Sequence, residues 1–170
     1  MTKRTKIISA YPCCGKSYIT LYKQDIFGEE SDNIQILDSD SSKFSWLYDD
    51  NGNKTNIRNP DFPSNYIKYI QDNIGKVDLI FVSSHSSVRE ALDKNKIQYT
   101  LVYPNIDLKD DWINRCKNRG NDEKFIDVIN KNWDDWNKEM KVCAERHINY
   151  ELQSKEEFLY DALISLGYVK

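Results

Sequence analysis

The segment from Ala10 to Ser17, AYPCCGKS, has the spacing of the phosphate-binding pattern Gly-x-x-x-x-Gly-Lys-Ser/Thr, with alanine at the first glycine position. In such a loop the second glycine lets the backbone approach phosphate oxygens, which successive amides then bind. Lys16 is predicted to reach the β- and γ-phosphates of a nucleotide, and Ser17 to offer its hydroxyl to Mg²⁺. The predicted nucleotide-binding residues are Tyr11, Pro12, Cys13, Cys14, Gly15, Lys16 and Ser17. The alternative is an ordinary strand-to-helix turn with an incidental Gly-Lys-Ser.

Two aspartates, Asp38 and Asp40, follow the second apolar run of the chain, in ILDSDSS. If the extended backbone continues, alternation places both carboxylates on the same side. Two neighbouring carboxylates repel each other unless a cation or a proton-transfer role offsets the repulsion. They therefore indicate either a metal and acceptor site or, alternatively, a polar turn that caps a helix.

Two arginines, Arg115 and Arg119, lie four residues apart in WINRCKNRGNDEKF and share one face of a predicted helix. A planar guanidinium binds phosphate oxygens in a bidentate manner, so this pair is a candidate for stabilising charge during phosphoryl transfer. The alternative is a solvated basic face that complements the helix dipole.

Together, the loop, the Asp-Ser-Asp sequence and the downstream arginines resemble the small P-loop kinases of the nucleoside monophosphate kinase, shikimate kinase and gluconate kinase group. By position, the resemblance implies that Asp38 lies near Mg²⁺ and that Asp40 orients or deprotonates an acceptor hydroxyl. It further implies that Arg115 and Arg119 belong to a mobile lid over the triphosphate. Lys16, Asp40, Arg115 and Arg119 are thus the expected catalytic residues.

The resemblance also locates an acceptor site and shows one departure. Arg89 occupies a region that binds acceptor anions in monophosphate kinases, and Arg58 is a further candidate. The third apolar run ends in Ser83-Ser84-His85, where many relatives keep an aspartate for the Mg²⁺ shell. His85 is therefore expected either to touch acceptor or phosphate or simply to be a hydrogen-bonded residue at a helix start.

Four aromatic residues surround the end of the second strand and the segment after it: Phe44, Trp46, Tyr48 and Phe62. They can stack on a nucleobase of the acceptor, or they can be ordinary core residues; both interpretations stay open.

The elements that must position these residues alternate between short apolar runs and amphipathic segments, a pattern typical of a parallel sheet covered on both faces. Strands are expected at 6–9, 34–37, 79–83, 100–103 and 147–152. Helices are expected at 16–23, from a cap at Ser64 to Gly75, from a cap at Ser86 or Ser87 to 94, from a cap at Asp107 to Gly120, at 121–146 and at 155–166. The segment 49–63, rich in Asn, Gly and Pro, is expected to be a long loop.

Composition fits one globular domain over residues 1–170, with 39% hydrophobic residues. The formal net charge of −3 disfavours a protein that grips duplex DNA through phosphates. No apolar run is long enough for a membrane span or a secretory signal, so a cytoplasmic protein with no membrane partner is expected. The four cysteines lack a Cys-x-x-Cys pair and are expected to be reduced thiols without a structural metal.

The sequence thus predicts an α/β fold: a single P-loop NTPase domain of the nucleotide kinase type, with a five-stranded parallel sheet, helices on both faces and a helical lid. The expected activity uses ATP and Mg²⁺ and transfers the γ-phosphate to a small nucleoside- or nucleotide-like acceptor, at a hydroxyl that includes modified-base hydroxyls. A monophosphate acceptor and a non-catalytic nucleotide-binding module are the alternatives. The sequence leaves the oligomeric state undetermined.

Overall fold

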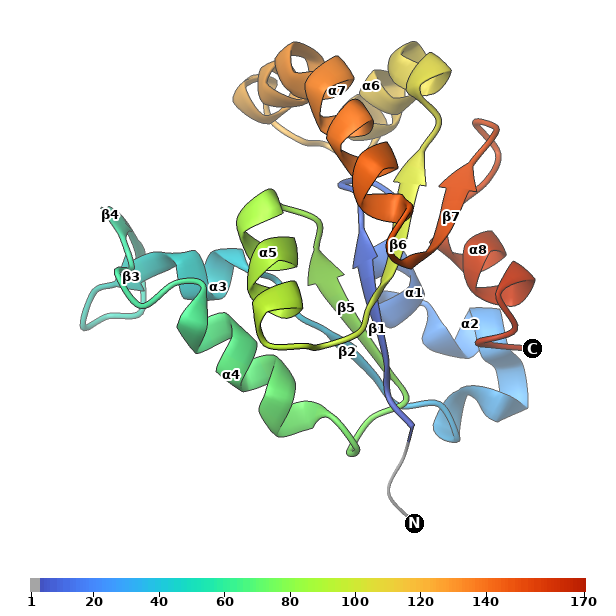
Figure 1. Cartoon of the computed structure of the whole chain (residues 1–170), viewed down its shortest axis with the longest axis horizontal. Coiled ribbons are helices and arrows are strands. Elements are labelled where there is room, and N and C mark those ends of the chain that lie inside the picture. Colours follow the sequence, from blue (N-terminus) through green and yellow to red (C-terminus); the bar gives the residue numbers. More distant parts are fainter. Residues whose placement is uncertain (1–3) are drawn as a thin grey trace.

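A computed structural model describes residues 4–170. Its centre is a five-stranded parallel sheet in the order β2-β5-β1-β6-β7 (Figure 1). The strands are β1 (Lys6–Ala10), β2 (Ile36–Asp38), β5 (Leu79–Ser83), β6 (Thr100–Pro104) and β7 (Ile148–Leu152). The three inner strands are almost wholly buried, as their continuous apolar sequences require in a sheet covered on both faces. The predicted α/β class and five-stranded parallel sheet are confirmed.

Helices cover both faces of this sheet (Figure 1). One layer contains α1 (Lys16–Leu21), α2 (Lys23–Phe27) and α8 (Leu159–Ser165). The opposite layer contains α4 (Ser64–Asn73), α5 (Ser86–Lys94) and α7 (Glu123–Ala144), and α6 (Lys109–Asn118) packs on α7. Short segments complete the chain: η1 (Gly28–Asp32), α3 (Ser42–Ser45) and η2 (Ile106–Leu108).

The strand order brings the candidate residues to one edge of the sheet. The chain leaves β1 toward β2 on one side and leaves β6 toward β7 on the other, so the loops after β1 and β6 diverge. In open α/β sheets, ligands bind in the crevice that such divergence opens beyond the carboxyl ends of the strands. The segment after β1 is the predicted phosphate loop.

The expected loop at 49–63 is wrong, because it contains a strand. β3 (Trp46–Tyr48) and β4 (Lys54–Arg58) form an antiparallel hairpin that projects beside α3. The hairpin was missed because most of its residues are exposed, so no alternation of apolar and polar residues marks it. The Trp46 ring stabilises it instead, with Lys54 Nζ 4.7 Å and the Arg58 guanidinium 3.9 Å from the ring centre.

Several predicted helix boundaries also need correction. The first helix breaks at Tyr22 into α1 and α2, and the last begins at Leu159 rather than at 155. The predicted caps Ser64 and Ser86 are already helical, and Asn105 rather than Asp107 caps η2, accepting from the Asp107 amide. Pro63 and His85, which flank α4 and α5, make no side-chain cap bond, so a nearby serine does not by itself fix where a helix begins.

Candidate functional site: a glycine loop beside a cavity

The loop between β1 and α1 turns through two residues with left-handed backbone. Cys13 has φ 63° and Gly15 has φ 108°. A Cβ on Gly15 would meet the Phe158 ring only at 3.6 Å, an ordinary contact. Gly15 is therefore required by backbone conformation rather than by space, because other residues rarely adopt such a positive φ.

The loop and the first turn of α1 present several amides without an intramolecular acceptor. Between the Cys14 amide, which donates to Tyr11 O at 3.2 Å, and the Ile19 amide, which donates to Gly15 O at 3.1 Å, the chain makes no other such bond. In this stretch, five amides have no acceptor within residues 4–170, those of Cys13, Gly15, Lys16, Ser17 and Tyr18. A run of free amides around a left-handed turn forms an anion-binding nest.

Lys16 supplies a cation at this nest. Its ammonium donates to Ala10 O at 2.8 Å, so the side chain folds back across the loop. Burial lowers the pKa of Lys16, an effect that the nearby Asp38 carboxylate opposes and the Arg119 guanidinium reinforces. A desolvated ammonium with one neutral partner gains most from an incoming anion.

The back of the loop is held by aromatic side chains and by main-chain bonds. Trp112 Nε1 donates to Pro12 O at 2.8 Å, and the Leu159 amide donates to Cys14 O at 2.8 Å. The Tyr11 side chain is buried edge-to-face against Trp133, with 5.6 Å between ring centres. Tyr11 was predicted to bind nucleotide, but its ring is buried and its amide already donates to Val102 O at 2.9 Å.

Ser17 and Asp38, the predicted metal ligands, lie near this loop. The Ser17 hydroxyl makes no hydrogen bond within the described chain, and the Asp38 carboxylate is close enough to Lys16 to raise its pKa. Among residues 4–170, no group of three or more His, Cys, Asp or Glu residues is arranged to bind a metal. One hydroxyl and one carboxylate suit Mg²⁺, which keeps several waters and takes other ligands from substrate phosphates.

Asp40 holds the turn after β2. Its carboxylate accepts from the Ser42 amide at 2.9 Å and from the Ser42 hydroxyl at 2.8 Å, so it caps the start of α3. The helix-cap alternative is therefore real, but Asp40 also lines a cavity next to the loop. The two Ser42 bonds leave lone pairs on both carboxylate oxygens, and these can accept a proton or a hydrogen bond from a ligand.

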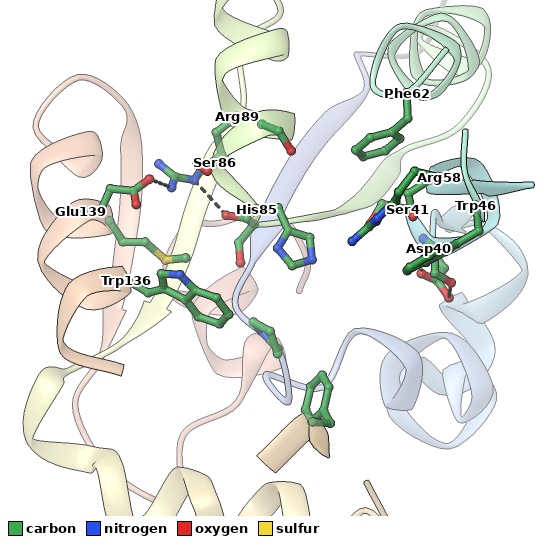
Figure 2. A pocket seen from close by; sticks show the side chains of 17 residues that line it. Asp40, Ser41, Trp46, Arg58, Phe62, His85, Ser86, Arg89, Trp136 and Glu139 are labelled. Atoms are coloured by element: carbon green, nitrogen blue, oxygen red, sulfur yellow. Dashed lines mark hydrogen bonds and ion pairs between the residues drawn. The ribbon is translucent and has the colours of Figure 1, made fainter. Parts of the chain in front are cut away.

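A cavity of about 590 Å³ opens beside the phosphate loop, with Pro12 in its lining. Figure 2 shows His85 between two walls. One wall carries Asp40, Trp46, Arg58 and Phe62, and the other carries Arg89, Trp136 and Glu139. This volume falls in the usual range for small-molecule sites, about 300–1,000 Å³. All four predicted substrate-binding residues, Asp40, Arg58, His85 and Arg89, thus line one cavity.

The pKa of His85 depends on the charged residues around this cavity. Its pKa is lowered, first by desolvation and then by the cations Lys16, Arg58 and Arg89, while Asp40 acts in the opposite direction. The imidazole is therefore neutral at pH 7 and can accept or donate one hydrogen bond. His85 also precedes α5 as its N-terminal flanking residue, as the helix-start alternative predicts, while contact with an acceptor stays a prediction.

The two cavity arginines differ in availability. Arg89 is buried, donates from Nε to Ser84 O at 2.9 Å and forms an ion pair with Glu139. Arg58 stacks on Trp46 and, among residues 4–170, forms no ion pair. Arg58 is therefore the freer cation for an anionic ligand, and Arg89 mainly joins α5 to α7.

The predicted lid arginines lie on α6 and at its end. Arg115 is stacked between the Trp112 and Phe158 rings, 4.1 and 3.9 Å from their centres, and donates to Lys155 O and Glu157 O at 2.5 Å each. Its Nε and Nη1 are buried and have no partner within the described chain. Arg119 is near enough to Cys13 and Lys16 to lower the pKa of both. Arg115 likewise acts to lower the pKa of Cys14, so both arginines lie near the loop.

A second cavity of about 480 Å³ lies between α6 and the segment before α8, lined by Asn118, Arg115, Lys155 and Phe158 among others. Phe158 also approaches Gly15, so this cavity adjoins the phosphate loop. An aromatic ring and a stacked guanidinium offer flat surfaces to a planar ligand.

Sequence reasoning missed the wall that α7 contributes to the cavity of about 590 Å³. Trp136 and Glu139 lie in the segment 121–146, for which the sequence predicted a helix and no cavity residue. Trp136 follows Trp133 by three residues and so belongs to the same apolar stripe, which gave no signal that it faces a cavity rather than the core. Of the aromatic residues whose role was left open, Trp46 and Phe62 line the cavity, while Phe44 packs against Tyr66, with 5.1 Å between the ring centres.

No helix among residues 4–170 has the length and apolar character needed to cross a membrane. In comparisons with known proteins, no family model, no curated protein and no solved structure matches this chain.

Proposed function

We propose that this protein is a Mg²⁺-dependent P-loop kinase that transfers the γ-phosphate of ATP to a small nucleoside- or nucleotide-like acceptor, at a hydroxyl. One observation carries the proposal. The free amides of residues 13 and 15–18 and the Lys16 ammonium form an anion nest that adjoins a cavity containing a carboxylate. A phosphate donor and an acceptor can therefore be bound side by side.

On this proposal, the amide nest and Lys16 bind the polyphosphate, with Arg119 adding positive charge from the end of α6. Phosphoryl transfer depends mainly on placement and electrostatic stabilisation, which fixed amides and a desolvated cation supply. Ser17 and Asp38 would hold Mg²⁺, which neutralises charge on the phosphate oxygens when bound. The cavity beside Arg115 and Phe158 is the candidate place for the nucleobase of ATP.

Asp40 orients the acceptor hydroxyl or takes its proton, because it is the cavity carboxylate that makes no ion pair within residues 4–170. Its hydrogen bonds with Ser42 fix the carboxylate before substrate arrives. Phe62, Trp46 and Trp136 give the cavity aromatic walls, which favours an acceptor with a planar ring.

A monophosphate acceptor is the second candidate, and Arg58 favours it. Its guanidinium lines the cavity and, in the described chain, has no carboxylate partner. A phosphate acceptor is already an anionic nucleophile and needs a cation more than a base. The two candidates therefore differ in their dependence on Asp40 and Arg58.

The test is transfer of label from γ-labelled ATP, with Mg²⁺, to separate pools of nucleosides, nucleotides, sugars and DNA. The proposal expects label in the nucleoside or nucleotide pool, and loss of transfer in Lys16→Met. Lys68→Met is the matched control, since the Lys68 side chain is 76% exposed and pairs only with Asp72. Transfer only to monophosphates, insensitive to Asp40→Asn, would select the second candidate, and label in DNA would refute a small acceptor. ATP binding without transfer to any pool would leave a non-catalytic nucleotide-binding module.

A further inference from the structure

Two thiols meet between the phosphate loop and α6. The Sγ atoms of Cys13 and Cys116 lie 2.8 Å apart, although the two residues are far apart in sequence. All four cysteines are free and buried, and among the described residues only this pair is in sulfur–sulfur contact. A disulfide has an S–S bond of about 2.05 Å, so closing this gap needs a movement of less than about 1 Å.

We propose that Cys13 and Cys116 are a disulfide modification site, formed by a hydroperoxide and reversed by a dithiol, that ties the phosphate loop to α6. This inference goes beyond the proposed kinase activity and does not depend on it. It rests on the contact between the two sulfurs and on the backbone that holds them. The Trp112 indole, one turn from Cys116 on α6, already donates to Pro12 O beside Cys13. The two elements are thus fixed against each other before any oxidation.

The surroundings of the pair shift the pKa values of the two thiols in opposite directions. A hydrogen bond from Cys116 lowers the pKa of Cys13 to about 7, against the effect of burial, and Arg119 and Lys16 act in the same direction. The same contact and burial raise the pKa of Cys116. At neutral pH, Cys13 is therefore substantially thiolate and Cys116 keeps its proton, which suits a reactive thiol and its resolving partner.

The chemistry balances with hydrogen peroxide as the oxidant. The Cys13 thiolate attacks one peroxide oxygen, the O–O bond breaks, and a sulfenic acid and hydroxide form. The Cys116 sulfur then attacks the Cys13 sulfur, the S–O bond breaks, and the Cys116 proton leaves with the departing hydroxide as water. The hydroxide of the first step takes up the proton that the Cys13 thiol had released, so two thiols and one peroxide give one disulfide and two waters.

The disulfide would restrain the loop that carries the free amides. Cys13 contributes one of those amides, and Arg119 lies on the helix segment that Cys116 would anchor. A polyphosphate in the nest would also place negative charge beside Cys13 and disfavour its thiolate. Bound nucleotide is therefore expected to slow oxidation, by up to about tenfold.

The experiment treats the fully reduced, ligand-free protein with a small excess of hydrogen peroxide, blocks the remaining thiols with N-ethylmaleimide and maps peptides without reduction. The expected result is a Cys13–Cys116 linked peptide, two hydrogens lighter than the sum of the free peptides and restored by dithiothreitol. Cys13→Ser and Cys116→Ser should abolish the link, whereas Cys143→Ser, a change at another buried thiol, should leave it intact.

Peptide mapping of the wild-type protein needs no variant, so it decides the matter even if a substitution prevents folding. A Cys13–Cys14 or intermolecular link, or two thiols still alkylated after peroxide, would overturn the proposal. The nucleotide arm is separate. If the disulfide forms but ATP gives no protection, the modification site stands and the proposed nucleotide site is in doubt.

Discussion

Replacing Lys16 by methionine separates a ligand-binding role from a structural one. Methionine keeps much of the side-chain length but removes the ammonium, which donates to Ala10 O at 2.8 Å and lies in a desolvated environment. If a polyphosphate is bound there, the lost hydrogen bonds involve charged partners and contribute about 1.5–3 kcal/mol. Affinity for ATP should therefore fall by about 10- to 150-fold.

The same change should have little effect on folding. Lys16 has a lowered pKa in the native state, so the protonated form is disfavoured by folding and reduces stability at pH 7. This loss of stability disappears as the pH rises from the folded pKa of Lys16 to its unfolded pKa. It also disappears when methionine removes the charge. Losing the bond to Ala10 O costs about 0.5–1.5 kcal/mol in the other direction. Each 1 kcal/mol shifts the midpoint by about 2–4 °C in a chain of this length, so the net change should be within about 4 °C.

Titration calorimetry with ATP and Mg²⁺ measures the first effect, and thermal unfolding by circular dichroism without ligand measures the second. Lys68→Met should leave both unchanged, because that side chain is exposed. Equal ATP affinity in Lys16→Met and wild type, within twofold, would refute the nest as a polyphosphate site. A large fall in the unfolding midpoint would instead make Lys16 a structural residue.

Three further outcomes are expected. In Lys16→Met, the His85 pKa measured by NMR should rise toward its usual value, because a nearby cation that disfavours the imidazolium is gone. Asp40→Asn should lower the His85 pKa further, because a carboxylate that favours the imidazolium is neutralised. An unchanged His85 pKa in both variants would place these charges away from His85. Asp40→Asn should reduce transfer to a hydroxyl acceptor by about 10²- to 10⁴-fold while leaving ATP affinity unchanged, and full activity in a single-turnover assay would remove Asp40 from the chemistry. Trp112→Phe should lower the free energy of unfolding in urea by about 1–3 kcal/mol, because Pro12 O loses its donor; a neutral effect would show that the loop is braced in another way.

The loop and the sheet could be predicted because their signals are local. A strand of consecutive apolar residues, a glycine that permits positive φ and the Lys16-Ser17 pair stand next to one another in the sequence. The same holds for Asp38 and Asp40 after the second strand. Their chemistry depends on residue type and on the end of the strand to which they belong, and both can be deduced before the fold is known.

The residues that form the two walls of the cavity could not be predicted together from the sequence. Trp136 and Glu139 come from α7, far along the chain from Asp40 and Arg58. The four residues line one cavity only because the fold brings these distant segments together. The ion pair that occupies Arg89 and leaves Arg58 unpaired is equally a product of this packing. No spacing in the sequence predicts which of two arginines finds a carboxylate.

What the sequence by itself determined is the set of elements and the residues at their ends, since hydrophobic period, turn residues and strand termini act over a few neighbouring positions. What only the tertiary structure decided is which ends converge: the exposed hairpin, the wall from α7 and the contact of Cys13 with Cys116. These depend on the order of strands in the sheet and on side-chain packing between distant segments. Burial and charge at each site are set by neighbours that the chain brings together only when it folds.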